Sequence, residues 1–406
     1  MTDDSTYRPG LVGWLSLAQL INWGSIFYTF ALLMGPVESE LGLSRVEVSL
    51  AFSIAILAEG LLAYPVGRWI ERGLERRVMT GGSLLAAACL ALHSLVNSQL
   101  GFYAVWAGLG AAMAMVLYTP VFAVVTRRFP ADYRRAIITM TFLGGLASTV
   151  FIPLSAALIA QLSWRPALLC LAALHLLVCA PLHALALRNA PAKALRAAGE
   201  ATAGLTPNLR STMRGKPFLL VAAFMVLMTA VSTALPAHMI SLLRERGLSE
   251  AWVIAVPASL GAFQVLGRLF LFFFERHFDL HLANRLIPAL IPLGLLVLLG
   301  APLLAPDQSW LMLLFVLLFG VGNGMLTIVK GTAFAQYVNR DQVARLNGAL
   351  GLPLALARAA APLLLAGLWT QQAGYSYGLW LLFFAASLGV AALHRAAEKT
   401  AEHRGG

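Results

Sequence analysis

Charged side chains are scarce in this chain of 406 residues, since Asp, Glu, Lys and Arg together make up only 12% of it. A soluble globular protein carries about 25% charged residues. Hydrophobic residues reach 59% here, and the mean hydropathy is +0.78. This composition excludes an ordinary soluble enzyme and a disordered chain, and it predicts an integral membrane protein.

Cysteine is also rare, and Cys89, Cys170 and Cys179 all fall inside apolar runs. The sequence has no CxxC spacing, so we expect neither a disulfide framework nor a metal site. It also lacks a GxxxxGK[ST] loop, paired carboxylates and a Ser/His/Asp arrangement. We therefore expect no enzymatic activity and no cofactor.

Long apolar runs fill most of the chain, and each has the length of about 20 residues that crosses a bilayer as a helix. Twelve runs qualify: 11–37, 46–70, 78–96, 101–126, 136–160, 165–187, 217–243, 251–274, 283–304, 309–337, 346–368 and 375–394. The sequence thus predicts an all-α membrane protein with twelve transmembrane helices in two six-helix halves.

Positive charge exceeds negative charge, with a formal net charge of +11. Most Lys and Arg residues lie in every second segment between the apolar runs, whereas the other loops hold only Arg45, Arg165, Arg244 and Arg246. Such a bias marks the cytoplasmic side of a membrane protein. It predicts an inner-membrane protein with both termini in the cytoplasm, surrounded by lipid and without a nucleic-acid partner.

The longest polar stretch, 188–216, separates the sixth and seventh runs and has the composition of a linker. We expect an N-terminal half (1–187), a basic cytoplasmic linker (188–216) and a C-terminal half (217–406). A Glu-Arg pair, a Gly-x-Gly and a proline recur in matching runs of the two halves at near-constant spacing. This pattern indicates a parallel repeat and a two-halved transporter.

The loop 67–77 reads Gly-Arg-Trp-Ile-Glu-Arg-Gly-Leu-Glu-Arg-Arg and is similar to the G-x-x-x-D-R-x-G-R-R signature of the major facilitator superfamily. It departs from the signature at Glu71, Leu74 and Glu75. The resemblance implies the family's twelve-helix fold and a charge clamp at the helix ends. The residues of that gating clamp would be Glu71, Arg72 and Arg76.

Within the superfamily, the chain resembles the branch of monocarboxylate transporters and oxalate/formate exchangers. The motifs that suggest this branch are Asn22-Trp23-Gly24, the segment 148–154 followed by Trp164-Arg165, and Gly267-Arg268. The glycine-proline motif usual in drug/proton antiporters is not seen. A drug or metabolite exporter of the same fold is therefore the alternative to an anion carrier.

The branch resemblance implies roles for several residues. Arg268 falls where monocarboxylate carriers place an arginine that binds the substrate carboxylate, and Arg358 resembles the second cation of oxalate exchangers. Gln264 replaces the acid that those carriers have four residues earlier, and Tyr28 replaces their first-helix lysine. The replacement of the acid by Gln264 departs from those carriers' scheme for proton coupling.

Charges inside apolar runs are the most informative residues of the sequence itself. A charge at a helix centre costs about 2.5–3.5 kcal/mol, and Arg268, Lys330 and Arg358 all lie within runs, whereas Glu59 is the only deep acid. An anionic substrate would complete this set. The alternatives are snorkelling of Arg268 or Lys330 to water, and a salt bridge between Arg358 and Glu59.

Uncharged polar residues form a second group of candidates. Asn22, Tyr28, Tyr118, Gln264 and Asn323 line the predicted substrate pocket or, alternatively, make contacts between helices. His238, and less so His175, is a candidate proton carrier, and its alternative is a hydrogen bond to a neighbouring helix. Glu59 is a candidate for coupling, either as a partner of Arg358 or as a proton carrier.

These observations together predict a secondary active transporter that moves a small organic anion, such as a monocarboxylate, by alternating access. We expect a monomer with a proton as the candidate coupling ion. A membrane receptor is the hypothesis from another class, and a substrate-dependent flux would exclude it.

Overall fold

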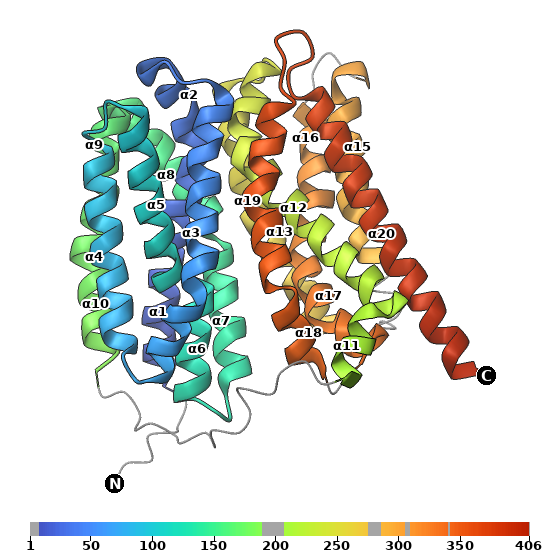
Figure 1. Cartoon of the computed structure of the whole chain (residues 1–406). Helices are drawn as coiled ribbons and strands as arrows, with labels where there is room; N and C mark the ends of the chain where they lie inside the picture. Colours follow the sequence, from blue (N-terminus) through green and yellow to red (C-terminus); the bar gives the residue numbers. More distant parts are fainter. Residues whose placement is uncertain (1–7, 189–206, 275–285, 305–308, 340–341, 406) are drawn as a thin grey trace. The chain divides into compact units, whose positions relative to one another are not determined.

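The computed structural model describes residues 8–188, 207–274, 286–304, 309–339 and 342–405. These residues are helical almost throughout, and their only bridge pairing is an isolated one between Thr370 and Gly374. The chain divides into two compact units, Met1–Leu195 (unit 1) and Arg196–Gly406 (unit 2). Both units are bundles of long helices (Figure 1).

Unit 1 is built from six helical stretches, four of which are interrupted within the apolar run. Its elements are α1 (Pro9–Asn22), η1 (Trp23–Tyr28), α2 (Thr29–Leu41), α3 (Arg45–Glu71), α4 (Glu75–His93), α5 (Gln99–Val116), α6 (Tyr118–Arg128), α7 (Tyr133–Gly145), α8 (Ala147–Leu162), α9 (Trp164–Leu174), η2 (His175–Cys179) and α10 (Ala180–Ala186). The elements η1 and η2 are π-helical turns that widen a continuous helix.

Unit 2 repeats this plan after a short leading helix. Its elements are α11 (Pro207–Arg214), α12 (Lys216–Glu245), α13 (Glu250–Phe274), η3 (Ile287–Ala289), α15 (Leu290–Leu304), α16 (Ser309–Phe315), η4 (Val316–Gly320), α17 (Val321–Tyr337), α18 (Val343–Ala349), α19 (Gly351–Gly367) and α20 (Ser376–Gly405).

The helices match the predicted membrane spans. Among the described residues, nine helices are long and apolar enough to cross a membrane. Two shorter apolar helices, Ile287–Ala301 and Gly351–Gly367, fall in the predicted ninth and eleventh runs, and α4 covers most of the third. The predicted fold class is therefore confirmed. Part of the predicted linker, 189–206, lies outside the described residues, and residues 207–214 form helix α11.

Local sequence determines where the helices turn. Helix α2 ends at Gly42, whose φ of 64° is in the left-handed region that glycine adopts at little cost. Ser44 then begins α3 with a capping box: its side chain accepts from the Glu47 amide, and Glu47 accepts from the Ser44 amide at 2.8 Å.

Small residues set the closest helix packing in each unit. A Cβ on Gly110 of α5 would overlap the carbonyl of Ala55 on α3. In unit 2, a Cβ on Gly324 of α17 would overlap the carbonyl of Gln264 on α13. Membrane helices pack closely through such positions because lipid provides no hydrophobic force between them.

Candidate functional site

Arg268 of α13 reaches the backbone of the next helix. Its Nε donates a hydrogen bond to the Gly324 carbonyl of α17 at 3.3 Å, and the side chain is partly buried. The close approach of α13 and α17 at Gly324 brings this carbonyl within reach. A guanidinium has five N–H donors, so this bond uses only part of the capacity of Arg268.

Lys330 lies further along α17 and faces α12. Its Nζ donates to the Thr229 hydroxyl at 3.1 Å, and it is partly buried. Arg358, on α19, is also partly buried. Helices α13, α17 and α19 of unit 2 thus each carry one partly buried cation.

Polar groups accompany these cations on the same helices. Asn323 of α17 accepts a hydrogen bond from Ser232 of α12 at 2.7 Å through its Oδ1. The backbone of Gln264 packs against Gly324, one helical turn before Arg268. Four residues of the predicted site therefore lie on the two packed helices α13 and α17: Gln264, Arg268, Asn323 and Lys330.

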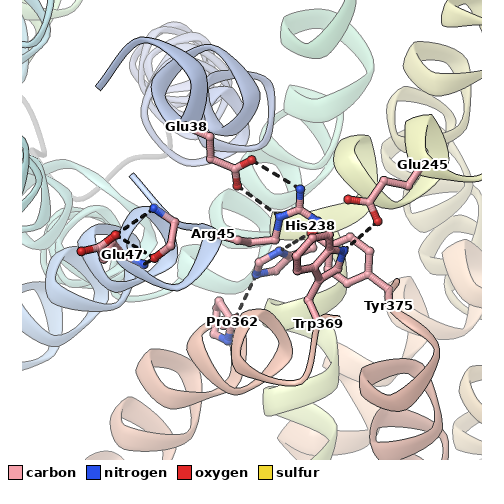
Figure 2. Close-up of polar contacts among 9 residues, drawn as sticks. Glu38, Arg45, Glu47, His238, Glu245, Pro362, Trp369 and Tyr375 are labelled. Atoms are coloured by element: carbon pink, nitrogen blue, oxygen red, sulfur yellow. Dashed lines mark hydrogen bonds and ion pairs between the residues drawn. The ribbon is translucent and has the colours of Figure 1, made fainter. Parts of the chain in front are cut away.

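His238 joins three helical segments of unit 2. Its Nε2 lies 2.9 Å from the Pro362 carbonyl of α19, and its Nδ1 lies 3.0 Å from the Tyr375 hydroxyl that precedes α20 (Figure 2). Because a carbonyl only accepts, the neutral ring with its proton on Nε2 satisfies both contacts. The ring is fully buried. Its two contacts are hydrogen bonds to neighbouring segments, the alternative to a proton carrier that the sequence left open.

In unit 1, Pro120 determines which group the predicted pocket residue Asn22 contacts. Pro120 has no N–H, so it leaves the Val116 carbonyl without its helical donor at the break between α5 and α6. The side-chain amides of Gln19 and Asn22 both donate to this carbonyl, at 2.6 and 3.2 Å. Asn22 is fully buried and ties α1 to the break.

The other residues of the Asn22-Trp23-Gly24 motif also contact neighbouring helices. The Trp23 ring lies 5.0 Å from that of Tyr118, centroid to centroid. Gly24 allows close approach to Phe151 of α8, because a Cβ there would overlap the Phe151 ring. Tyr28, at the end of η1, is partly buried and stands edge-on to Phe27 with centroids 5.4 Å apart.

Two further predicted residues of unit 1 are buried. Glu59 lies on α3 with 8% of its surface exposed. His175, in η2, is fully buried, and its Nε2 lies 2.7 Å from the Ser25 hydroxyl. Because Ser25 donates its own proton to the Ile21 carbonyl, it accepts from His175.

The loop between α3 and α4 buries one acid, Glu75, at a position where this sequence departs from the family signature. Glu71, Arg72 and Arg76 are exposed, whereas Glu75 is fully buried. Glu75 pairs with Arg127 at 3.3 Å and with Arg128 of α6.

The arginines of this cluster continue to backbone carbonyls at other helix ends. Arg127 donates to Ile70 at 3.0 Å, and Arg128 donates to Leu187 at 3.1 Å. The cluster thus joins the ends of α3, α4, α6 and α10. A sequence signal was present, because two consecutive arginines follow the fourth apolar run and an acid precedes the third run.

A second network missed from the sequence lies at the opposite end of unit 1. Glu40 accepts from the Trp164 indole and from Arg165, and Arg165 also donates to the Ser94 and Val96 carbonyls at 2.7 and 2.8 Å. Unit 2 has a related contact, in which Glu245 accepts from the Trp369 indole at 2.9 Å (Figure 2). No group of three or more His, Cys, Asp or Glu in the described ranges could hold a metal ion.

Solved structures of other proteins have the same fold. The nucleoside transporter NupG covers 95% of this chain and 98% of its own, with a TM-score of 0.74 at 15% identity. A bacterial homologue of the human lysosomal transporter Spinster, inward-facing and unoccupied, covers 97% and 99%, with a TM-score of 0.72 at 14% identity. At such identities the likeness shows the fold alone.

The sequence itself gives the family. The family model of the Major Facilitator Superfamily matches residues 15–302, so the chain belongs to that family of transporters and is not an enzyme. Monocarboxylate transporter 13 of Bos taurus is 30% identical over 264 residues, which are 58% of this chain. The match spans 58% of the length of that relative.

Proposed function

We propose that this secondary transporter moves a small organic anion, such as a monocarboxylate, by alternating access. The observation that carries the proposal is the set of three cations, Arg268, Lys330 and Arg358, which three helices supply within the membrane-spanning part of unit 2. Each costs about 2.5–3.5 kcal/mol to place at a membrane helix centre. A carboxylate substrate offsets this cost by accepting charge-assisted hydrogen bonds.

The chemistry of the surrounding helices supports the same substrate class. Thr229 and Ser232 of α12 supply hydroxyls beside Lys330 and Asn323. Hydroxyl and amide donors orient a carboxylate, whereas a lipophilic cation would meet only positive charge there. The name of the bovine relative is consistent with a monocarboxylate, and its partial coverage leaves the substrate as a proposal.

We further propose that the protein lies in the inner membrane with both termini in the cytoplasm. The support is the distribution of Lys and Arg among the loops. A cysteine introduced at an exposed loop position such as Arg72 should then react in intact cells only with reagents that cross the membrane. Labelling by an impermeant reagent would reverse the orientation.

Binding of carboxylates to an Arg268→Gln variant tests the proposed site. We expect affinity to fall by the value of a charge-assisted hydrogen bond, about 1.5–3 kcal/mol. Arg268→Lys should restore only part of it, because a point charge replaces a forked guanidinium. The matched control is Arg244→Gln, which removes an exposed cation paired with Glu250 at the end of α12.

The measurement is ligand-induced thermal stabilisation of the purified protein, with a panel of carboxylates and lipophilic cations. Ligand binding raises stability by about 2.7 kcal/mol at a hundredfold excess over Kd. Unchanged affinity in a folded Arg268→Gln protein would reject Arg268 as a ligand. Stabilisation by lipophilic cations instead of carboxylates would reject the anion proposal.

A further inference from the structure

Two side-chain oxygen atoms are buried without a hydrogen-bond donor beside the break between α5 and α6. Leu117 is extended there, with φ of −79° and ψ of −163°, so the helix is interrupted after Val116. The side-chain amides of Gln19 and Asn22 donate to the Val116 carbonyl. Their own oxygens, Oε1 of Gln19 and Oδ1 of Asn22, have no hydrogen-bond partner among the described residues.

The orientation of both amides follows from the chemistry of their shared partner. A carbonyl only accepts, so each amide turns its NH₂ group toward Val116. A flipped amide would place oxygen against oxygen, and the two amide oxygens therefore face elsewhere. Both side chains are 0% exposed, so bulk water does not reach these acceptors. Polar atoms buried in this way are normally satisfied by a protein group, an ordered water or an ion.

The electrostatics of the break favour a cation over a neutral group. Val116 is the last residue of α5, a helix of 18 residues, and the carbonyl end of a helix carries a partial negative charge. The two amide oxygens, about one turn apart on α1, add their own negative ends to it. In transporters with interrupted helices, the carbonyl ends of half-helices coordinate sodium.

Trp23 provides a further unsatisfied group on the same face of this helix. Its indole Nε1 is buried and has no acceptor in the part of the chain that the structure describes. Trp23 follows Gln19 by four positions, and its ring lies 5.0 Å from that of Tyr118, which begins α6. An N–H cannot bind a cation, but a water molecule that gives one lone pair to the cation can accept from the indole with the other.

We propose that Gln19 and Asn22 form a sodium-binding site of unit 1 at the carbonyl end of α5. Oε1 of Gln19 and Oδ1 of Asn22 are its side-chain ligands, and carbonyls of the last turn of α5 and a water molecule complete the shell. Neutral oxygens suit a monovalent ion, whereas sites for calcium and magnesium use carboxylates. The inference concerns unit 1 alone and does not depend on the anion proposed for unit 2.

Thermal unfolding of the purified full-length protein tests the site, with sodium chloride compared against choline chloride at equal concentration. Saturating sodium should raise the melting temperature of the wild type by at least about 2 °C, because an ion that binds only the folded state stabilises it. Asn22→Ala removes one ligand and should lose this rise. Asn22→Asp loses the donor to Val116 but keeps an oxygen ligand, so it should retain the rise at alkaline pH.

The matched control is Ser25→Ala, which removes a buried hydroxyl of η1 that contacts Ile21 and His175 and should respond to sodium as the wild type does. Equal melting temperatures of the wild type in the two salts would show that only water lies beside these amides, and would overturn the proposal. A rise retained by Asn22→Ala overturns it too. A rise lost by both variants of Asn22 would reduce this residue to a donor for Val116 and reject it as a ligand.

Direct binding of radioactive sodium decides if Asn22→Ala does not fold. The wild type should bind the ion saturably, and Gln19→Met, which keeps the length of the side chain without its amide, should not. Absence of saturable binding by the wild type, or equal binding by both proteins, contradicts the site.

Discussion

The two units of the molecule share a glutamate–tryptophan contact at one end and differ in the charged side chains of their membrane-spanning helices. In unit 1, Glu40 accepts from Trp164, and in unit 2, Glu245 accepts from Trp369, and the partners are 124 positions apart in the sequence in both cases. A left-handed glycine follows each glutamate by two positions, with φ values of 64° and 75°. The turn and its tryptophan contact are thus repeated.

Both interiors hold amides, hydroxyls and histidine, and they differ in the cations that unit 2 adds within its membrane-spanning helices. Unit 1 has amides, hydroxyls and histidine, including Gln19, Asn22 and His175, whose contacts are to backbone carbonyls or to hydroxyls of the same unit. Unit 2 also buries His238 and joins Ser232 to Asn323, and it adds the partly buried cations Arg268 and Lys330. The repeat therefore preserves the contacts that shape each bundle, while the interior side chains that could bind a ligand have diverged.

The largest expected effect concerns the charge cluster that unit 1 buries at one end. Glu75→Gln leaves Arg127 and Arg128 without their carboxylate, and breaking a buried pair in this way costs about 3–5 kcal/mol of unfolding free energy. Thermal unfolding in detergent measures the loss. Glu71→Gln, at an exposed acid of the same loop, is the matched control and should stay within about 0.5 kcal/mol. Equal effects of the two changes would contradict the burial of Glu75.

The second prediction tests whether the glycine contacts of the two units are equivalent. Gly110→Ala and Gly324→Ala each force a methyl group into the carbonyl of a packed helix, so each should destabilise by about 1–3 kcal/mol or more. The controls, Gly67→Ala in α3 and Gly331→Ala in α17, meet no atom within 4 Å. They should be neutral or stabilise by up to about 1 kcal/mol. If one of the two tight glycines tolerates alanine, the repeat does not extend to helix packing.

The smallest effects concern the repeated tryptophans. Trp164→Phe and Trp369→Phe each remove the indole donor to a glutamate and should cost about 0.5–1.5 kcal/mol of stability. Because both units have the contact, the two losses should be similar. Trp14→Phe and Trp310→Phe, at sites 57% and 58% exposed, are the controls. A loss of stability for Trp164→Phe only would contradict the equivalence of the two contacts and would assign the difference to Arg165, which also binds Glu40.

The fold class could be predicted from the sequence because a membrane helix is recognised by the length of its apolar run. Apolar length also has limits as a guide. The π-helical turns η1, η2 and η4 lie within apolar runs and leave the run length unchanged, so nothing in the runs predicted them. Helix α11 falls within the predicted linker 188–216, because its eight residues begin with proline and form no apolar run.

The site was less predictable, because burial of a single side chain depends on how its helix is rotated. Glu71 and Glu75 are four residues apart in one loop motif, and only the packing of α6 decides that Glu75 is the buried acid. The cations were easier to find, since a charge inside an apolar run is visible in the sequence. Their hydroxyl and carbonyl partners, such as Thr229 and Gly324, lie on other helices and were not predicted.

The hydrogen bonds from the first helix to the Val116 carbonyl, which Pro120 leaves without a helical donor, have a consequence for the evolution of the chain. A proline at position 120 creates a demand for donors that Gln19 and Asn22 satisfy from a distant part of the sequence. If proline is lost, residue 120 regains an N–H that competes for the Val116 carbonyl. The amides of Gln19 and Asn22 are then no longer needed as donors to it. Related sequences should therefore change these three positions together, with amides at 19 and 22 accompanying proline at 120.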